Sequence, residues 1–105
     1  MSYQVIWSNQ SENQLDSIFD YYLKHSTLKI ARKIINEIID EPNKLVKNLE
    51  IGQIEMLLKG RKNEYRYLIC NNYKIIYSLD KSTKLIKISD VFDTRQHPKK
   101  MNRIK

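Results

Sequence analysis

The side chains best suited to chemistry lie in the second half of the chain, on a predicted open face of a β-sheet. Tyr65, Tyr67, Lys74 and Lys87 occupy alternate positions in the predicted strands. Cationic side chains beside aromatic rings can hold a nucleic acid, because the charges contact phosphates and the rings stack on bases. The same patch would suit an acidic protein equally well. These residues therefore predict a binding surface and leave the kind of partner open.

The chain offers no set of residues spaced to bind a metal ion. Its two histidines, His25 and His97, lie far apart, and Cys70 is its single cysteine. A zinc site needs several such ligands at defined spacing, so we expect no metal and no other cofactor. Cys70 falls among apolar residues and is typical of a small buried side chain rather than a nucleophile. His97 precedes Pro98, where a turn residue is more common than a catalytic acid, and both interpretations stay open.

Positive charge is concentrated in the second half of the chain. Residues 1–52 carry six Lys and Arg against seven Asp and Glu, whereas residues 53–105 carry thirteen against five. The net charge of +7 therefore comes from the predicted sheet and from a tail that contains Lys99, Lys100 and Arg103. Such a bias favours a polyanionic target or an acidic partner. A lysine-rich surface that only aids solubility has the same composition, and the tail is either such a surface or an arm that contacts phosphates.

Three antiparallel strands are predicted between Tyr65 and Pro98. Asn71 and Asn72 form the first turn, because asparagine tolerates a positive φ better than other non-glycine residues, and residues 80–83 form the second. Turn length sets the register of the strands. The predicted cross-strand pairs are Leu68 with Ile75, Arg66 with Tyr77, Tyr77 with Ile86, and Ile75 with Ile88.

This register sorts the strand residues onto two faces of different chemistry. One face is almost wholly apolar and comprises Leu68, Cys70, Tyr73, Ile75, Tyr77, Leu79, Ile86 and Ile88. The other comprises Tyr65, Tyr67, Ile69, Lys74, Ile76, Ser78, Lys87 and Ser89. The first face must be covered by another element, whereas the second can face water or a partner. Arg66 falls on the apolar side, where we expect it to pair with an acid from the helices or to cap the sheet edge.

The first half of the chain predicts the cover for the apolar face. Residues 3–7 are typical of a strand, a helix is predicted from Ser8 or Asn9, and a second helix from Ser26 or Thr27. Apolar residues recur at helical spacing in both: Leu15, Ile18, Phe19 and Tyr22 in the first, and Ala31, Ile34, Ile35, Ile38 and Ile39 in the second. The second stripe continues beyond Pro42, which predicts one kinked helix rather than two.

The order of elements predicts an α+β domain. A strand is expected over residues 54–58, so an N-terminal strand precedes a helical hairpin packed on a mainly antiparallel C-terminal sheet of three or four strands. The 105 residues form one domain, residues 1–105. No apolar run is long enough to span a membrane, the first residues lack a signal-peptide pattern, and one cysteine suits a reducing compartment. We therefore expect a cytoplasmic protein without a membrane partner.

These residues, in this order, resemble the RelE/ParE superfamily of bacterial type II toxin–antitoxin toxins. The resemblance covers nearly the whole chain and lies in the order and spacing of its motifs. They are Val5-Ile6-Trp7-Ser8, Leu15 with Ile18 and Tyr21, Ala31, Gly52, Tyr65-Arg66 with Leu68, residues 73–77, and Val91-Phe92-Asp93-Thr94-Arg95-Gln96 with Pro98. The resemblance implies a RelE/ParE-like fold and a small basic toxin, neutralised by an acidic cognate antitoxin from the adjacent gene that wraps around it.

Two activities share this scaffold, and the fold cannot choose between them. RelE-like members cut messenger RNA in the ribosomal A site without a metal, whereas ParE-like members poison DNA gyrase and are not enzymes. For cleavage the resemblance implies Lys74, Arg95 and His97 as catalytic residues, but the C-terminal tyrosine of many such nucleases is missing. That incomplete set favours gyrase inhibition. A non-toxic basic nucleic-acid-binding or structural module is the third alternative.

The expected contacts with the target or the antitoxin come from the predicted open face and the tail. They are Tyr65, Tyr67, Lys74, Lys87, Arg95, Lys99, Lys100 and Arg103.

Overall fold

The computed structural model describes residues 2–104 and folds them around one five-stranded sheet with the strand order β1-β5-β4-β3-β2. The strands are β1 (Gln4–Trp7), β2 (Gln53–Ile54), β3 (Arg66–Cys70), β4 (Tyr73–Asp80) and β5 (Leu85–Asp93). The α-helices are α1 (Asn9–His25) and α2 (Leu28–Asp40). Three 3-10 helices follow later in the chain: η1 (Glu41–Val46), η2 (Met56–Leu58) and η3 (Pro98–Arg103). This arrangement confirms the predicted α+β fold. The sheet has one strand more than expected, because β1 joins it in parallel beside β5.

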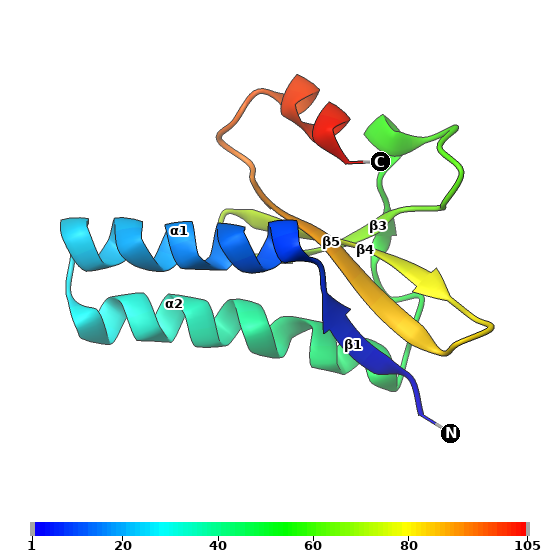
Figure 1. Ribbon diagram of the computed structural model, residues 1–105, viewed down its shortest axis with the longest axis horizontal. Helices are drawn as coiled ribbons and strands as arrows, with labels where there is room; N and C mark the ends of the chain where they lie inside the picture. Colours follow the sequence, from blue (N-terminus) through cyan, green and yellow to red (C-terminus); the bar gives the residue numbers. More distant parts are fainter. Residues whose placement is uncertain (1, 105) are drawn as a thin grey trace.

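The two helices form the predicted antiparallel hairpin (Figure 1). Ser8 caps α1, since its side chain accepts a hydrogen bond from the backbone N–H of Ser11, and Thr27 caps α2 in the same way through Ile30. Only two residues, Ser26 and Thr27, connect the helices. Such a short connection makes neighbouring helices antiparallel.

The main core lies between this hairpin and the predicted apolar face of the sheet. Ile38, Ile75, Tyr77 and Ile86 are fully buried there, and Ile18 of α1 packs among them. This confirms which face of the sheet the helices cover. Cys70 belongs to the same core, as its position among apolar residues predicted, and burial raises the pKa of its thiol.

Pro42 ends the second α-helix instead of kinking it. α2 stops at Asp40, and residues 41–46 continue as the 3-10 helix η1, which has Pro42 in its first turn. Proline is tolerated in a first turn because its missing N–H would have no partner there. Leu45 of η1 is fully buried, so the apolar stripe does continue past the proline, although the α-helix does not.

The register of the first hairpin is as predicted, whereas that of the second differs. Leu68 pairs with Ile75 across β3 and β4, but Tyr77 pairs with Ile88 instead of Ile86. The second turn spans residues 81–84 because the Asp80 carboxylate accepts hydrogen bonds from Ser82 and Thr83, while Lys84 adopts a positive φ of 57°. A shift of two residues leaves every side chain on its predicted face, because side chains alternate with a period of two.

A β-bulge then reverses the alternation in the second half of β5. Tyr77 pairs with Ile88 and Ile76 with Asp90, so Ser89 is the extra residue of β5. Beyond it, Val91 points into the helix-covered core. Asp90 lies opposite Ile76 and therefore points to the other side of the sheet.

Much of the second face of the sheet is covered, which corrects the prediction of an open face, although Ile69 and Lys87 remain exposed. Chain segments from the C-terminus and from η2 cover it (Figure 1), forming a smaller core of Leu58, Tyr65, Ile76, Phe92, Met101 and Ile104. The C-terminal tail is therefore neither a free arm nor a purely solvated surface, since its two apolar residues anchor it. Arg61 holds its end by donating a hydrogen bond to the carbonyl of Ile104.

The region before β3 also differs from the prediction. The strand expected over residues 54–58 shrinks to β2, followed by η2, because the Glu55 side chain caps that turn by accepting from the N–H of Leu57. Arg66 caps the sheet edge, donating to the carbonyl oxygen of Gly52 at 2.9 Å, and meets no acid from the helices. Among residues 2–104, no helix is both long and apolar enough to cross a membrane.

Gly52 lies against the ring of Tyr77, and we expect Gly52→Ala to destabilise the fold. An added Cβ would lie 2.3 Å from the Tyr77 hydroxyl oxygen and 2.7 Å from a ring carbon. Tyr77 is fully buried and donates to the carbonyl of Leu49, so it cannot move without disturbing the core. The free energy of unfolding should fall by about 1–3 kcal/mol, measured by urea denaturation. Asn36→Ala on the exposed side of α2 is the control, and an unchanged midpoint for Gly52→Ala would contradict the packing described.

Candidate functional site

A buried carboxylate at the bulge joins β5, helix α1 and the C-terminal segment. Asp90 is fully buried and accepts two hydrogen bonds from Arg103, from Nε to Oδ2 at 2.8 Å and from Nη2 to Oδ1 at 2.9 Å. The amides of Gln14 and Gln10 on α1 donate to the same carboxylate. A buried charge is costly unless it is paired and hydrogen-bonded. Asp90 can therefore be buried at this position only because these donors are present.

Gln14 also completes the edge of the sheet. The last pair between β1 and β5 is Trp7 with Ile88, so the following residues of β5 have no strand on that side. The side-chain oxygen of Gln14 accepts a hydrogen bond from the N–H of Val91 at 2.7 Å. One glutamine therefore takes the place of a neighbouring strand and supplies a donor to Asp90.

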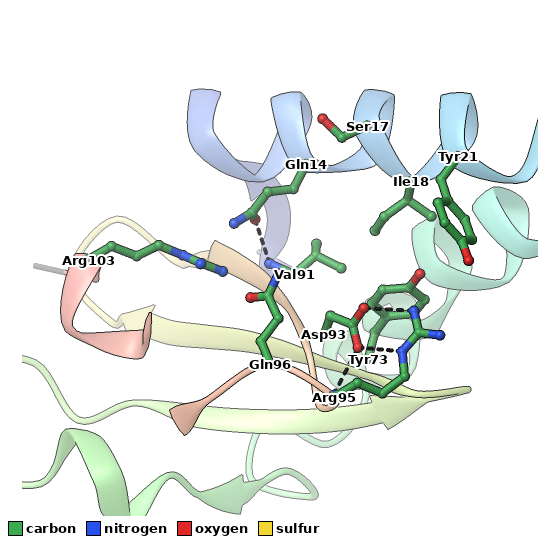
Figure 2. A pocket seen from close by; sticks show the side chains of 10 residues that line it. All are labelled: Gln14, Ser17, Ile18, Tyr21, Tyr73, Val91, Asp93, Arg95, Gln96 and Arg103. Carbon is green, nitrogen blue, oxygen red and sulfur yellow. Dashed lines mark hydrogen bonds and ion pairs between the residues drawn. The ribbon is translucent and has the colours of Figure 1, made fainter. Parts of the chain in front are cut away.

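A cavity of about 290 Å³ lies between α1 and the end of β5 (Figure 2). Its walls are formed by Gln14, Ser17, Ile18 and Tyr21 of α1, Tyr73 of β4, Val91 and Asp93 of β5, and Arg95, Gln96 and Arg103 of the C-terminal region. Burial and a hydrogen bond with Tyr22 raise the pKa of Tyr73, so its hydroxyl is neutral at physiological pH. The cavity thus combines polar groups and two arginines with apolar walls.

Arg95 at this cavity is held by the neighbouring carboxylate of Asp93. The guanidinium donates from Nε to Oδ1 at 3.0 Å and from Nη2 to Oδ2 at 2.8 Å, and the Arg95 backbone N–H also donates to Oδ1. Hydrogen bonding with Arg95 lowers the pKa of Asp93, and the same pairing raises that of Arg95. The Arg95 side chain is 58% exposed, so it is oriented by the protein while remaining accessible.

Lys74 lies on the other side of the sheet and is neutralised within the protein. Its Nζ is 2.8 Å from Oε2 of Glu55, a carboxylate that is only 3% exposed. The same ammonium group lies 4.2 Å from the ring centroid of Tyr67, and the Tyr67 hydroxyl donates to Gln53. An ammonium group held by a buried carboxylate and an aromatic ring is a structural element, because moving it toward a phosphate would leave Glu55 unpaired.

The remaining residues of the predicted binding surface are divided among different surroundings. Tyr65 is 4% exposed within the smaller core, so its placement on an open face was wrong. Lys87 is exposed and lies 3.5 Å from Asp80. Lys99 and Lys100 are exposed in η3, and no acidic partner for either occurs among residues 2–104.

His97 begins η3 as its capping residue. Its Nδ1 accepts a hydrogen bond from the N–H of Lys99 at 3.1 Å, and the residue is exposed. The structure does not gather the three candidate catalytic residues at one site. Lys74 pairs with Glu55 on one side of the sheet, whereas Arg95 binds Asp93 on the side of α1, and the His97 side chain caps a turn.

The described part of the chain holds no group of three or more His, Cys, Asp or Glu side chains able to bind a metal ion.

Sequence reasoning missed Asp90, Gln14, Gln96 and Glu55, which organise these sites. One signal was present for Asp90. Apolar residues at 86, 88 and 91 break the period of two at Ser89, and such a break in a strand indicates a bulge. Gln14 carries no comparable signal, because nothing in its local sequence distinguishes it from other polar residues of a helix, and Gln96 was visible only as a residue of a motif, without a role.

The comparisons with known proteins agree with this architecture. The family model described as the ParE toxin of the type II toxin–antitoxin system, parDE, matches residues 5–98. A chain of the structure described as the chromosomal ParDE toxin–antitoxin system from P. aeruginosa matches with a TM-score of 0.70. That match covers 87% of this chain and 95% of the other at 17% identity, which shows a shared fold. No curated protein sequence matches significantly.

Removing the buried carboxylate should destabilise the protein strongly. We expect Asp90→Ala to lower the free energy of unfolding by about 3–5 kcal/mol, because Arg103 loses its partner and the amides of Gln10 and Gln14 lose an acceptor. Urea denaturation measures the loss, and Asp16→Ala, an exposed acid on α1, should stay within about 0.5 kcal/mol of wild type. Equal effects of the two substitutions would rule out the central role of Asp90.

The Asp93–Arg95 pair should make a pH-dependent contribution to stability. Because the folded protein lowers the pKa of Asp93 below its ordinary value of 3.8, the contribution is complete above that value and disappears as the pH falls through the lowered pKa. Wild type and Asp93→Asn should therefore differ in urea midpoint at about pH 6 and converge in strong acid. The difference should be small, since the pair is largely exposed. A difference that grows on acidification would have the wrong sign.

Proposed function

This chain belongs to the family of ParE toxins from type II toxin–antitoxin systems, and we propose that it arrests bacterial growth by binding DNA gyrase rather than by cutting messenger RNA. The proposal places it in the cytoplasm, where gyrase acts on DNA. It also implies an acidic cognate antitoxin that covers the basic surface until it is removed.

One observation supports a binding mechanism above all. Metal-independent RNA cleavage needs a base, an acid and cations gathered around one phosphate. Of the candidates for those roles, Lys74 lies on the other side of the sheet from Arg95, and Lys74, Arg95 and His97 each already have a partner within the chain. A protein that acts by contact needs none of these groups to be free or close together.

The surface proposed for partner contacts follows from exposure and charge. Arg95 and Lys87 remain exposed despite their acidic neighbours, and among residues 2–104 Lys99 and Lys100 have no acidic partner. Arg95, Lys99, Lys100 and the partly exposed Arg103 lie in or just before η3, whereas Lys87 lies on β5 and half-buried Tyr67 on β3. Arginine and tyrosine are the residue types that most often dominate protein interfaces. Tyr65 and Lys74 are left out of this surface, because they are engaged inside the protein.

Inhibition of gyrase is expected on direct assay. Purified toxin should block supercoiling of relaxed plasmid by purified gyrase, and its induction in bacteria should activate DNA-damage signalling and stop growth. Co-expression of the antitoxin should restore growth. His97→Ala should keep full toxicity and Lys74→Met should keep it as long as the protein folds, because neither residue performs chemistry under this mechanism.

Mapping of messenger 5′ ends after induction separates this mechanism from the alternatives. Cuts in phase with codons that vanish in His97→Ala, with supercoiling unaffected, would establish the ribonuclease mechanism instead. Normal growth with abundant folded toxin would leave a non-toxic binding module. Lys81→Ala in the turn between β4 and β5 is a matched exposed lysine control outside the proposed surface and should behave as wild type.

A further inference from the structure

A buried acceptor without a donor faces the cavity beside α1. The side-chain oxygen Oε1 of Gln96 is buried and has no hydrogen-bond partner among the described residues. The backbone of Gln96 is fixed, since its N–H donates to the carbonyl of Asp93 at 2.9 Å. Figure 2 shows its amide reaching toward α1, with Arg103 to one side and Arg95 to the other. Leaving such an acceptor unpaired costs about 1–3 kcal/mol, which a partner that supplies a donor would recover.

The surrounding charges restrict what this partner group can be. Asp90 and Asp93 neutralise Arg103 and Arg95, so the cavity has no net charge to attract an anion, and a carboxylate has no proton to give Gln96 at neutral pH. A cationic group is disfavoured as well, because the groups that line the walls are two guanidinium groups against a single carboxylate, that of Asp93. A neutral group with both a donor and an acceptor remains.

A carboxamide has this combination on two separate atoms, whereas a hydroxyl has its donor and acceptor on one oxygen, so the carboxamide can contact Gln96 and an arginine at the same time. Its NH₂ can donate to Gln96, and its oxygen can accept from a guanidinium N–H that is not used internally. Each arginine has such N–H groups, because Arg95 and Arg103 each direct only Nε and Nη2 to their carboxylates. Ile18 and Val91 supply an apolar wall for the aliphatic part of the side chain.

We propose that this cavity is a receptor for the side chain of an asparagine or glutamine carried by the antitoxin. The entrance favours a protein partner, since Tyr21 is 48% exposed there and Arg95 is 58% exposed. Charge complementarity favours the antitoxin. Lys99 and Lys100 lie in η3, the segment that also contributes Arg103 to the cavity, and they would attract an acidic segment of the antitoxin. This inference rests on the antitoxin proposed above and not on gyrase, so the supercoiling assay can succeed or fail independently of it.

Titration calorimetry of the full-length toxin with its cognate antitoxin tests the proposal. Gln96→Leu removes the acceptor and should weaken binding about ten- to a hundredfold, whereas Gln96→Glu keeps an acceptor and should retain most of the affinity. Ser17→Phe, which obstructs the cavity from α1, should weaken binding to a similar extent. Asn13→Leu makes a comparable amide-to-leucine change on α1 outside the cavity and should bind as wild type.

Two further measurements identify the occupant. The antitoxin's asparagines and glutamines are replaced one at a time by alanine, and a double-mutant cycle with Gln96→Leu should reveal one residue whose effect disappears in the variant toxin. Thermal unfolding of free Gln96→Leu toxin should show no loss of stability, because its acceptor has no partner to lose.

The proposal is overturned if none of the antitoxin amides is coupled to Gln96. It is also overturned if Gln96→Leu lowers the melting temperature of the free toxin while antitoxin affinity stays unchanged, since the cavity would then be a hydrated part of the fold. A Gln96→Leu toxin that binds antitoxin normally but no longer inhibits gyrase would assign the cavity to the target instead. The proposal also fails if Asn13→Leu and Gln96→Leu weaken antitoxin binding equally, because the loss would then not depend on the cavity.

Discussion

The ion pair between Asp90 and Arg103 is the interaction on which the second half of this structure depends. A fully buried carboxylate is tolerated only because Arg103 binds both of its oxygens and two amides of α1 add further donors. The bulge at Ser89 is what points Asp90 toward these donors and, one residue later, sends Val91 into the main core. The Asp90 carboxylate therefore links α1, β5 and the C-terminal segment. Residues of the same three elements line the cavity beside α1.

The C-terminal segment changes the character of the sheet. It buries Met101 and Ile104 against Tyr65 and Phe92, so much of a face that was predicted to be open becomes a second small core. On the same face Lys74 contacts Glu55 and Tyr67. Tyr65 and Lys74 are therefore engaged within the protein and are not available to a large ligand on this face.

Internal pairing also divides the basic residues into two groups with different roles. Arg66 and Lys74 are engaged with carbonyl or carboxylate groups of the chain and stabilise its fold, and Arg103 does so through Asp90 while its side chain stays partly exposed. Lys99 and Lys100 have no acidic partner among residues 2–104, and Arg95 is paired but accessible. The accessible charge is not confined to η3, however, because Lys59, Lys62 and Lys81 are exposed as well.

The sequence by itself determined the order of the main helices and strands, narrowed each helix cap to two residues, and gave the register of the first hairpin and the face of the sheet that the helices cover. These features follow from local turn chemistry and from periodic apolar residues. Gly52 was visible as a motif residue, but only the structure shows why it is required, namely the Tyr77 ring against its Cα. The tertiary structure alone decided that the second face is covered, that Lys74 is neutralised and that Gln96 faces a cavity. Each of these depends on contacts between residues far apart in the chain, such as Gln14 with Asp90 and Lys74 with Glu55. Such contacts produce no periodic pattern in the sequence. From the sequence alone, a polar residue that makes a buried contact cannot be distinguished from a polar residue at the surface.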